Sequence, residues 1–309
     1  MRSKTCEVIY RAALKDPNIF LLTGDLEHPV VNDFKKNIPA QHINVGMAEQ
    51  NMIGIAAGLA LSGKKVFVLG IIPFVTFRCL EQIRNDVCYQ NADVTVIGEG
   101  GGFFYSEAGP THHGTEDIGA MRVLPNLKIV APADPEQAGL LIEKVIFSRG
   151  PFYFRLAGKN AFPIDELRSG DNGIEIGKGQ VVREGKDISI FSYGATVLEA
   201  LAAADILDRQ GHRTEVVNFH TLKPIDRELV GNRAYRRKVI FTLEEHVLIG
   251  GLGSAIAEII CSTHFGEKLI FKSFGIDNCF VHDVGSRQYL RRIHGLTGPQ
   301  VADQILSFL

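Results

Sequence analysis

Polar side chains recur where apolar, strand-like stretches of this sequence end. Asp25 follows residues 19–22, Glu49 follows 43–45, residues 73–78 follow 66–69, a glycine-rich loop with two histidines follows 94–97, and Arg155 follows 152–154. Ligands of parallel sheets bind beyond the carboxyl ends of the strands. We therefore expect these five loops to meet around one site.

Glu49 is the charged residue that fits its surroundings least. It begins a run of small and apolar residues, 49–60, and no basic residue stands within one helical turn of it. A carboxylate buried there needs solvent, a paired charge or a hydrogen-bond donor from a bound molecule. Alternatively, Glu49 occupies the first turn of a helix and is stabilised by the helix dipole. The residues themselves leave both interpretations open.

The pair His112-His113 lies in a loop bounded by glycines. Zinc binding is disfavoured because adjacent side chains point apart and no further Cys or His follows at ligand spacing. Proton transfer or binding of a hydroxyl group fits these imidazoles better. The glycines at 98–102 do not match Gly-x-Gly-x-x-Gly, so they give little support for a phosphate-binding turn.

Other candidate residues have ordinary structural explanations. Phe74 and Phe77 could be core aromatics, and Arg78 and Arg155 could be solvated or paired surface charges. Asp25 could simply form a turn.

Composition excludes several classes of protein. The net charge of −2 and pI near 6.6 give no reason to expect nucleic acid or an anionic membrane as a partner. Apolar runs fall short of the roughly 18 residues that a membrane helix needs, and the N-terminus lacks the apolar core of a signal peptide, so a cytoplasmic chain is expected. The five scattered cysteines indicate reduced core residues.

Strand-like and helix-like segments alternate through the chain, which predicts an α/β fold with two doubly wound, parallel-sheet domains. We expect a first domain at 1–160, a linker at 161–178 rich in Gly, Pro, Asp and Asn, and a smaller α/β domain at 179–309. Among the helices we expect are a nearly fully buried one after Glu49 and a continuous one at 76–90.

Four segments together resemble the transketolase family: 44–50 (Asn-Val-Gly-Met-Ala-Glu-Gln), 74–84, 109–113 (Gly-Pro-Thr-His-His) and 244–251. They span almost the whole chain but only the C-terminal half of a transketolase. The chain is similar to the smaller subunit of split transketolases, which carries the pyrimidine-binding domain and the transketolase C-terminal domain.

The family binds the cofactor diphosphate and its divalent metal through a Gly-Asp-Gly segment, which this sequence lacks. The resemblance therefore implies a separate N-terminal subunit and a heterotetramer built on a dimer of this chain. Thiamine diphosphate would lie between the two kinds of subunit, with Mg²⁺ bound mainly by the partner and no metal ligand expected here.

The resemblance also implies roles for residues around the cofactor. Glu49 corresponds to the glutamate that hydrogen-bonds the aminopyrimidine ring nitrogen and is expected to be catalytic. Phe74 is expected to stack on the aminopyrimidine, with Phe77 as the alternative. Further positions expected to line the cofactor pocket are Asp25, Leu26, Met47 and Arg78.

Three more residues are implied to contact substrate. His112 corresponds to the active-site histidine that contacts the reacting oxygen, and His113 is expected to support it. Arg155 is expected to bind a substrate phosphate through two hydrogen bonds. Ala108, where familiar transketolases have Asp, and Gly100 to Gly102, where a phosphate-binding histidine is expected, point to a modified or nucleotide-linked sugar.

The implied reaction moves a two-carbon ketol unit from a ketose, or ketose phosphate, to an aldose. One alternative is an enzyme like 1-deoxy-D-xylulose-5-phosphate synthase, which uses pyruvate. The β subunit of a 2-oxo-acid dehydrogenase fits Gly-Pro-Thr-His-His poorly, and a non-catalytic regulatory paralogue would not need Glu49 and His112. For the segment 244–253 we expect a role in packing and interfaces.

Overall fold

The computed structural model describes residues 1–25, 28–158, 163–167, 174–237, 239–262 and 269–309. Strands rich in β-branched and aromatic residues form its first sheet. The strand order is β10-β5-β6-β4-β3-β1-β2. Their bounds are β1 Ile19–Thr23, β2 His42–Asn44, β3 Lys65–Ile71, β4 Val94–Glu99, β5 Lys128–Val130, β6 Phe152–Leu156 and β10 Thr221–Lys223.

The second sheet has the order β12-β11-β8-β9-β7. Its strands are β7 Gln180–Arg183, β8 Ile188–Ser192, β9 Thr214–Asn218, β11 Val239–Val247 and β12 Ile270–Ile276. All neighbouring pairs in both sheets are parallel except β10 with β5 and β7 with β9. The predicted α/β fold is confirmed, but both sheets are mixed because each ends in a short antiparallel edge strand.

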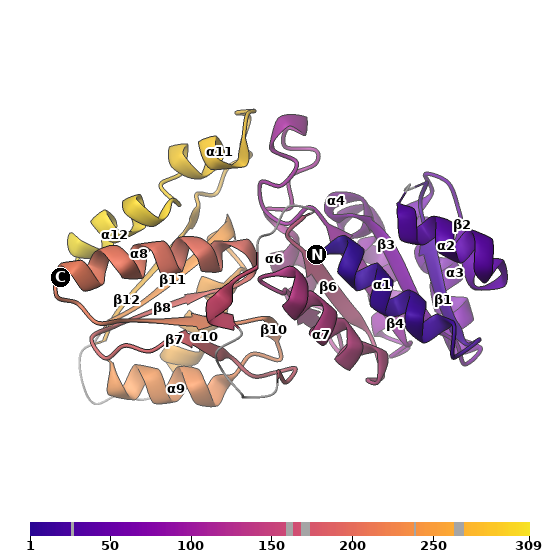
Figure 1. The fold of residues 1–309 in the computed structure, drawn as a ribbon, viewed down its shortest axis with the longest axis horizontal. Helices are drawn as coiled ribbons and strands as arrows, with labels where there is room; N and C mark the ends of the chain where they lie inside the picture. Colours follow the sequence, from indigo (N-terminus) through magenta and orange to yellow (C-terminus); the bar gives the residue numbers. More distant parts are fainter. Residues whose placement is uncertain (26–27, 159–162, 168–173, 238, 263–268) are drawn as a thin grey trace.

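Helices cover both faces of each sheet (Figure 1). The α-helices of four or more residues are α1 Arg2–Ala13, α2 Pro29–Asn37, α3 Glu49–Leu61, α4 Ile72–Val75, α6 Asp117–Arg122, α7 Pro135–Ile146, α8 Val197–Arg209, α9 Arg227–Arg236, α10 Leu252–Ser262, α11 Arg287–Ile293 and α12 Gly298–Leu306. Side-chain caps mark several starts; for example, Asp134 accepts a hydrogen bond from the backbone N–H of Gln137 at 2.7 Å.

The two halves share one apolar core. Met52 and Val68 from the first half belong to the same buried cluster as Phe191, Ile240 and Leu252 from the second. Strand β10, from the second half of the sequence, also completes the edge of the first sheet. These contacts fix the second half against the first, so residues from both halves can form one site.

Two expectations about helices were wrong in detail. Helix α3 buries only one face: Gln50, Asn51, Gly54, Gly58 and Leu61 are exposed, because no described segment of the chain covers them. The continuous helix expected at 76–90 is broken into a 3-10 turn at Phe77–Cys79, the short α5 at Leu80–Gln82 and a π-helical turn at Ile83–Cys88. Such irregular turns are frequent near functional sites.

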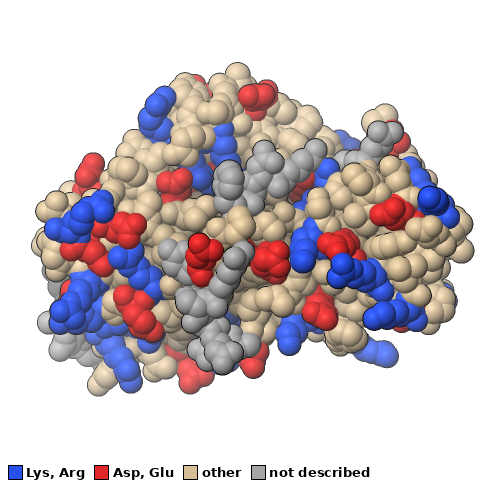
Figure 2. Space-filling view, viewed as in Figure 1, with Lys and Arg blue, Asp and Glu red and all other residues tan. Residues whose placement is uncertain are grey.

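In the described part of the chain, no helix combines the length and the apolar character needed to cross a bilayer. Basic and acidic side chains are interspersed on the face shown in Figure 2, in keeping with the near-neutral composition. Three free cysteines, Cys6, Cys79 and Cys88, are buried, whereas Cys261 and Cys279 are exposed, so the prediction of core cysteines was wrong for the last two.

Candidate active site

The loops after β1 and β2 are tied together by Asn44. Its side-chain oxygen accepts the backbone N–H groups of Asp25 and Gly46, both at 3.0 Å. Asp25 is exposed and has a positive φ of 56°, a conformation that Asp tolerates better than most residues. Leu26 lies outside the described residues. These bonds fix the backbone that leads into α3.

Glu49 is the first residue of α3, where the helix dipole favours a carboxylate. Only 7% of the residue is exposed, and its Oε2 accepts a hydrogen bond from Nη1 of Arg78 at 2.6 Å. The charge partner thus comes from 29 residues further along the chain. Met47, two residues earlier, is 83% exposed.

Arg78 also covers an aromatic ring. Its guanidinium carbon lies 4.5 Å from the centre of the Phe74 ring, within the range of a cation–π contact. The break between α4 and the following 3-10 turn places both side chains beside Glu49. Phe77, the alternative stacking residue, is 42% exposed and makes no described ring contact with this group.

His112 completes the group from the other side. Its ring meets that of Phe74 edge-on with centres 5.1 Å apart, and its Nδ1 lies 2.9 Å from the Thr111 hydroxyl. Tyr105 approaches the same imidazole edge-on at 6.3 Å. Burial, with Glu99 nearby, raises the pKa of Tyr105 to about 12, so its hydroxyl keeps its proton.

Glu49, Arg78, Phe74 and His112 therefore form one contiguous group, called here the Glu49 group, at the carboxyl ends of β2, β3 and β4. A buried carboxylate, a partly open aromatic face and a half-buried imidazole meet in it. Such a site can hold a planar ring with a basic nitrogen and present an imidazole to a reacting oxygen.

His113 lies on the opposite side of its loop. It is 2% exposed, meets Phe103 edge-on at 5.5 Å, and neither ring nitrogen has a hydrogen-bonding side chain among the described residues. Burial lowers its pKa. The structure does not bring His113 to the Glu49 group. Any support that His113 gives to His112 therefore acts by holding the backbone of their shared loop in place. Contact of His113 with substrate stays a prediction.

Arg155 has a buried carboxylate partner. Its Nε donates to Asp117 Oδ2 at 2.8 Å, its Nη2 donates to the Gly114 carbonyl at 2.7 Å, and the Tyr153 hydroxyl donates to the same Asp117 oxygen at 2.6 Å. Asp117 and Arg155 are 0% and 3% exposed. Arg155 therefore secures the loop that carries the histidines, and binding of a substrate phosphate by it stays a prediction.

Side chains of other residues lie so close to the backbone at 100–102 that only glycine fits there. A Cβ on Gly101 would come within 2.6 Å of the Arg155 guanidinium, and a Cβ on Gly102 would collide with the Glu245 carboxylate. Gly102 also has a φ of +65°. A histidine side chain has no room in this segment of the structure.

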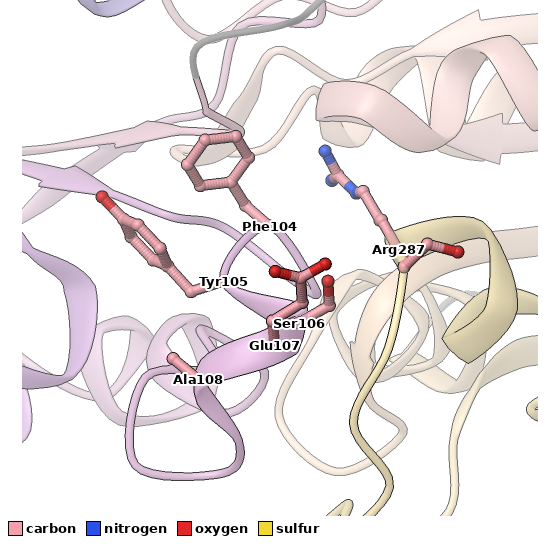
Figure 3. Close-up of a pocket in the computed structure, with 7 residues that line it drawn as sticks. Phe104, Tyr105, Ser106, Glu107, Ala108 and Arg287 are labelled. Atoms are coloured by element: carbon pink, nitrogen blue, oxygen red, sulfur yellow. The ribbon is translucent and has the colours of Figure 1, made fainter.

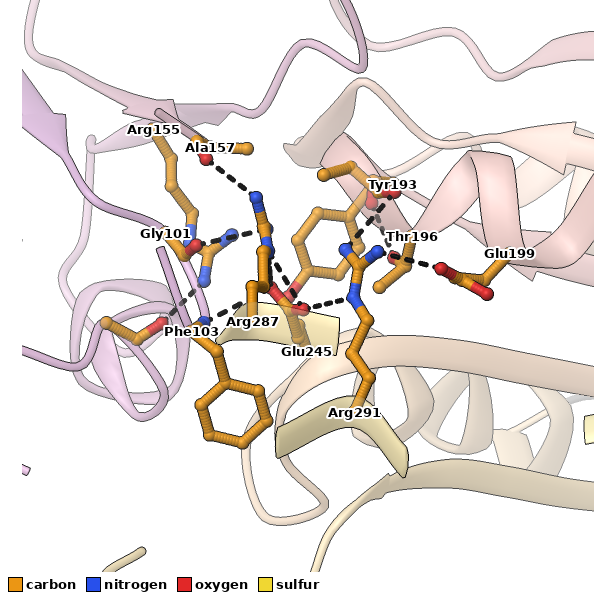
Figure 4. Close-up of polar contacts among 12 residues, drawn as sticks. Gly101, Phe103, Arg155, Ala157, Tyr193, Thr196, Glu199, Glu245, Arg287 and Arg291 are labelled. Carbon is orange, nitrogen blue, oxygen red and sulfur yellow. Dashed lines mark hydrogen bonds and ion pairs between the residues drawn. The ribbon is translucent and has the colours of Figure 1, made fainter. Parts of the chain in front are cut away.

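Glu245 joins the second half of the chain to this loop (Figure 4). Its carboxylate accepts hydrogen bonds from Arg287 and Arg291, with shortest distances of 2.5 Å, and from the backbone N–H of Phe103 at 3.2 Å. Arg287 in turn donates to the Ala157 carbonyl at 3.0 Å. Burial would raise the pKa of Glu245, but the two guanidinium groups lower it to about 2.

The neighbours of Glu245 have structural roles as well. Glu244 accepts the backbone N–H groups of Leu252 and Gly253, both at 2.8 Å, at the start of α10, and its burial raises its pKa to about 7. His246 Nε2 accepts the N–H of Gly119 at 3.2 Å, and burial lowers its pKa to about 4. These contacts agree with the predicted packing role of this segment, and its role in interfaces stays a prediction.

A pocket of about 620 Å³ opens beside the histidine loop. It is lined by Phe104, Tyr105, Ser106, Glu107, Ala108, Ser286 and Arg287, from both halves of the chain. In Figure 3 the Glu107 carboxylate and the Ser106 hydroxyl point into the space between Phe104 and Arg287. We call it the Glu107 pocket; the sequence did not predict it, because Ser286 and Arg287 lie far along the chain.

Sequence reasoning missed the partners Asn44, Glu99, Asp117 and Glu245, which position the predicted site residues. Glu99 follows the apolar residues 94–97 and Asp117 follows the loop with two histidines, so a carboxylate at these positions was the available sequence signal. In the described part of the chain, no cluster of three His, Cys, Asp or Glu side chains is placed to hold a metal ion.

Comparisons with known proteins agree with this architecture. The family described as "Transketolase, pyrimidine binding domain" matches residues 1–162, and "Transketolase, C-terminal domain" matches residues 177–301. A solved split-gene transketolase, described as an inactive β4 tetramer, superposes with a TM-score of 0.86 at 34% identity, covering 99% of this chain and 96% of that one.

Named relatives extend the comparison. An apulose-4-phosphate transketolase subunit of Phocaeicola vulgatus is 36% identical, covering 100% of this chain and 97% of its own length. The 6-deoxy-6-sulfo-D-fructose transketolase subunit SqwH of a Clostridium species is 35% identical, covering 97% and 92%. The 1-deoxy-D-xylulose-5-phosphate synthase of Microcystis aeruginosa is 33% identical over 96% of this chain, which spans 46% of it. The chain therefore belongs to the transketolase family and carries its pyrimidine-binding domain and its C-terminal domain.

Proposed function

We propose that this chain is the C-terminal subunit of a thiamine-diphosphate-dependent transketolase that works with a separate N-terminal subunit. In this reaction a ketose donor loses carbons 1 and 2 and leaves as an aldose two carbons shorter. An aldose acceptor gains both carbons and leaves as a ketose two carbons longer. The observation that carries the proposal is the Glu49 group, in which a buried carboxylate and an aromatic face meet one planar cation.

The residues present fit the pyrimidine end of the cofactor. An aminopyrimidine is planar, has basic nitrogens and needs a carboxyl group at its ring nitrogen and a stacking surface on its face. Glu49 and Phe74 offer these two contacts, and the planar Arg78 guanidinium occupies both of them here. The Arg78 side chain is 46% exposed, so it is free to turn outward when a ligand takes its place.

Bound thiamine diphosphate would supply the carbanion-stabilising centre that protein side chains lack. The chain itself would hold a proton between Glu49 and the bound ring, and Phe74 would fix the ring plane. His112 would donate a hydrogen bond to the oxygen that changes charge during transfer. Met47, now 83% exposed, and the open face of α3 would be covered by other subunits, which would exclude water.

A partner subunit is proposed because the diphosphate site is missing. The sequence contains no Gly-Asp-Gly segment, and no metal-binding cluster occurs in the described residues. We propose that an N-terminal subunit brings the diphosphate and Mg²⁺ site, and that two copies of each chain form a heterotetramer. A split-gene transketolase described as an inactive β4 tetramer, 34% identical, supports self-association of such a chain without its partner.

A pyruvate-using enzyme is the second candidate, favoured by the 33% identity to a 1-deoxy-D-xylulose-5-phosphate synthase. The complex of both subunits should therefore be given a ketose, with or without a terminal phosphate, or pyruvate as donor, together with an aldose acceptor. The proposal predicts a shortened aldose from the ketose and no CO₂ from pyruvate. Release of CO₂ from pyruvate would favour the synthase, and turnover that survives loss of Glu49 would favour a regulatory paralogue.

A further inference from the structure

We propose that the Glu107 pocket binds the non-reacting end of a sugar substrate and selects sugars whose end carries no phosphate. The inference rests on the proposed function, since it assigns the substrate class of that same site. It is carried by the charges and rings that line the pocket.

The pocket is placed to receive the distal part of a substrate. Tyr105 lines it and also meets His112 edge-on at 6.3 Å, and His112 meets Phe74 at 5.1 Å. Ala108 lies in its wall, four residues before His112. A sugar whose carbonyl end reacts beside His112 can therefore extend past Tyr105 into the pocket.

The only cation among the described residues lining the pocket is already neutralised. Arg287 donates from Nε to both oxygens of Glu245 at 3.1 Å and from Nη2 to one of them at 2.5 Å. Its Nη1 donates to the Ala157 carbonyl at 3.0 Å. A phosphate would have to compete with the buried Glu245 carboxylate for this partly exposed guanidinium, and leaving that carboxylate without its partner is costly.

Glu107 leaves the pocket with unbalanced negative charge. Its carboxylate points into the space (Figure 3), and no hydrogen bond or ion pair to another described residue holds it. Glu107 is exposed, yet like charges close together still repel, so a phosphate dianion beside this carboxylate is disfavoured. A carboxylate accepts hydroxyl hydrogens well, so it suits the end of an unmodified sugar.

Two further arginines of the first half, which do not line the pocket, also have carboxylate partners. Arg2 donates from Nη1 to Glu99 at 2.6 Å, and that carboxylate is fully buried. Arg155 is paired with Asp117. Each guanidinium thus has a buried carboxylate beside it, so the phosphate contact that the family resemblance predicts for Arg155 would have to compete with Asp117.

Aromatic rings fill the space beside two backbone glycines. A Cβ on Gly158 would collide with the Phe104 ring, and one on Gly100 would come within 2.5 Å of the Tyr105 ring. Both glycines have positive φ, at +115° and +103°. The rings lie against the backbone and leave apolar faces, together with Ser106 and Ser286, for the carbon skeleton and hydroxyls of a sugar.

The test is steady-state kinetics of the complex of both subunits with matched acceptors, an aldopentose and its 5-phosphate, and an aldotetrose and its 4-phosphate. The wild type should prefer the unphosphorylated acceptor in kcat/KM by about tenfold or more, the discrimination expected from charge and hydrogen-bond mismatch. Glu107→Gln should reduce this preference, mainly through KM, by weakening use of the neutral sugar and improving use of the phosphate. The matched control Glu143→Gln, on the exposed side of α7, should leave the ratio unchanged.

Two results would overturn the inference. The first is a preference for the phosphorylated acceptor whose kcat/KM ratio does not change in Glu107→Gln. This would show that the pocket does not distinguish the ends of sugars, while the proposed ketol transfer would stand. Failure of every acceptor to give a ketose product, although thiamine diphosphate binds, would remove the proposed function and the inference with it. Direct calorimetric binding of the unphosphorylated aldopentose, lost in Glu107→Gln, would support the inference independently of turnover.

Discussion

The Glu49 group combines residues from three separate segments of the sequence, and two long-range contacts explain how. The ion pair with Arg78 places Glu49 beside Phe74, and the edge-on ring contact places His112 beside Phe74. Their positions after strands made all four candidates, the family resemblance implied their roles, and the structure adds that they lie together. His113 and Arg155 were not brought to the group, because adjacent side chains diverge and because Asp117, the partner of Arg155, lies 38 residues away.

Removing the Glu49 charge tests the catalytic role of this chain. Glu49→Gln keeps the side-chain volume but replaces the carboxylate that is proposed to hold a proton on the cofactor ring. We expect turnover of the complex to fall by about 10²–10⁴-fold, the usual contribution of an acid–base group, with folding intact by circular dichroism. Glu81→Gln, an exposed residue in α5, serves as control. Unchanged turnover in Glu49→Gln would mean that this chain takes no part in the catalytic step.

Arg78 occupies the two contacts proposed for the aminopyrimidine, so it should compete with the ligand. The substitution Arg78→Met removes a half-exposed ion pair and a cation–π contact. Together these stabilise the position of Arg78 without ligand by roughly 1 kcal/mol. We expect the complex of both subunits to bind thiamine diphosphate about three- to tenfold faster, measured by stopped flow. Arg84→Met, on the exposed side of the neighbouring π-helical turn, should change nothing. Slower or weaker binding by Arg78→Met would instead mean that Arg78 holds the cofactor.

At the scale of elements, continuous runs of apolar residues predicted the central strands well. Residues 66–69 and 94–97 lie within β3 and β4, because buried parallel strands are continuous apolar runs. The edge strands β7 and β10 were not expected, since they are short and carry no continuous apolar run. Helix α3 was expected to be buried all round; its composition is that of a covered helix, yet only one face is covered within this chain.

In the loop after β4, the Glu245 carboxylate lies close against the backbone of Gly102, and the importance of this approach can be tested by substitution. Gly102→Ala places a Cβ against the Glu245 carboxylate at a φ of +65°, so it should disrupt a buried ion pair. We expect a loss on the order of 3–5 kcal/mol in the free energy of unfolding by urea titration. Gly63→Ala, with a φ of +88° and open space around it, should cost only about 1–2 kcal/mol. Equal losses would mean that the approach to Glu245 is unimportant.

At the scale of the whole molecule, Glu245 links the two halves, and its titration should set part of the acid stability. Its pKa in the folded chain is lowered to about 2, so its stabilising contribution is present above its ordinary range near 4.5 and is lost as the pH falls towards 2. Glu245→Gln should therefore lower the free energy of unfolding by about 3–5 kcal/mol at pH 7. The difference from wild type should shrink steadily below about pH 4.

The control for this pH dependence is Glu258→Gln, which removes a surface partner of Arg122. Its effect should stay below about 1 kcal/mol at every pH, because exposed ion pairs contribute little. A Glu245→Gln effect that does not change between pH 7 and pH 3 would mean that the lowered pKa of Glu245 does not stabilise the junction between the halves.

The central claim is that this chain holds only the pyrimidine half of a shared cofactor site. It is tested most directly by calorimetric titration of thiamine diphosphate with Mg²⁺ into the chain alone and into its mixture with the N-terminal subunit. We predict no measurable binding to the chain alone, because it has no Gly-Asp-Gly segment, and one cofactor per pair of chains in the mixture. Tight binding to the chain alone, or no binding to the mixture, would contradict the account.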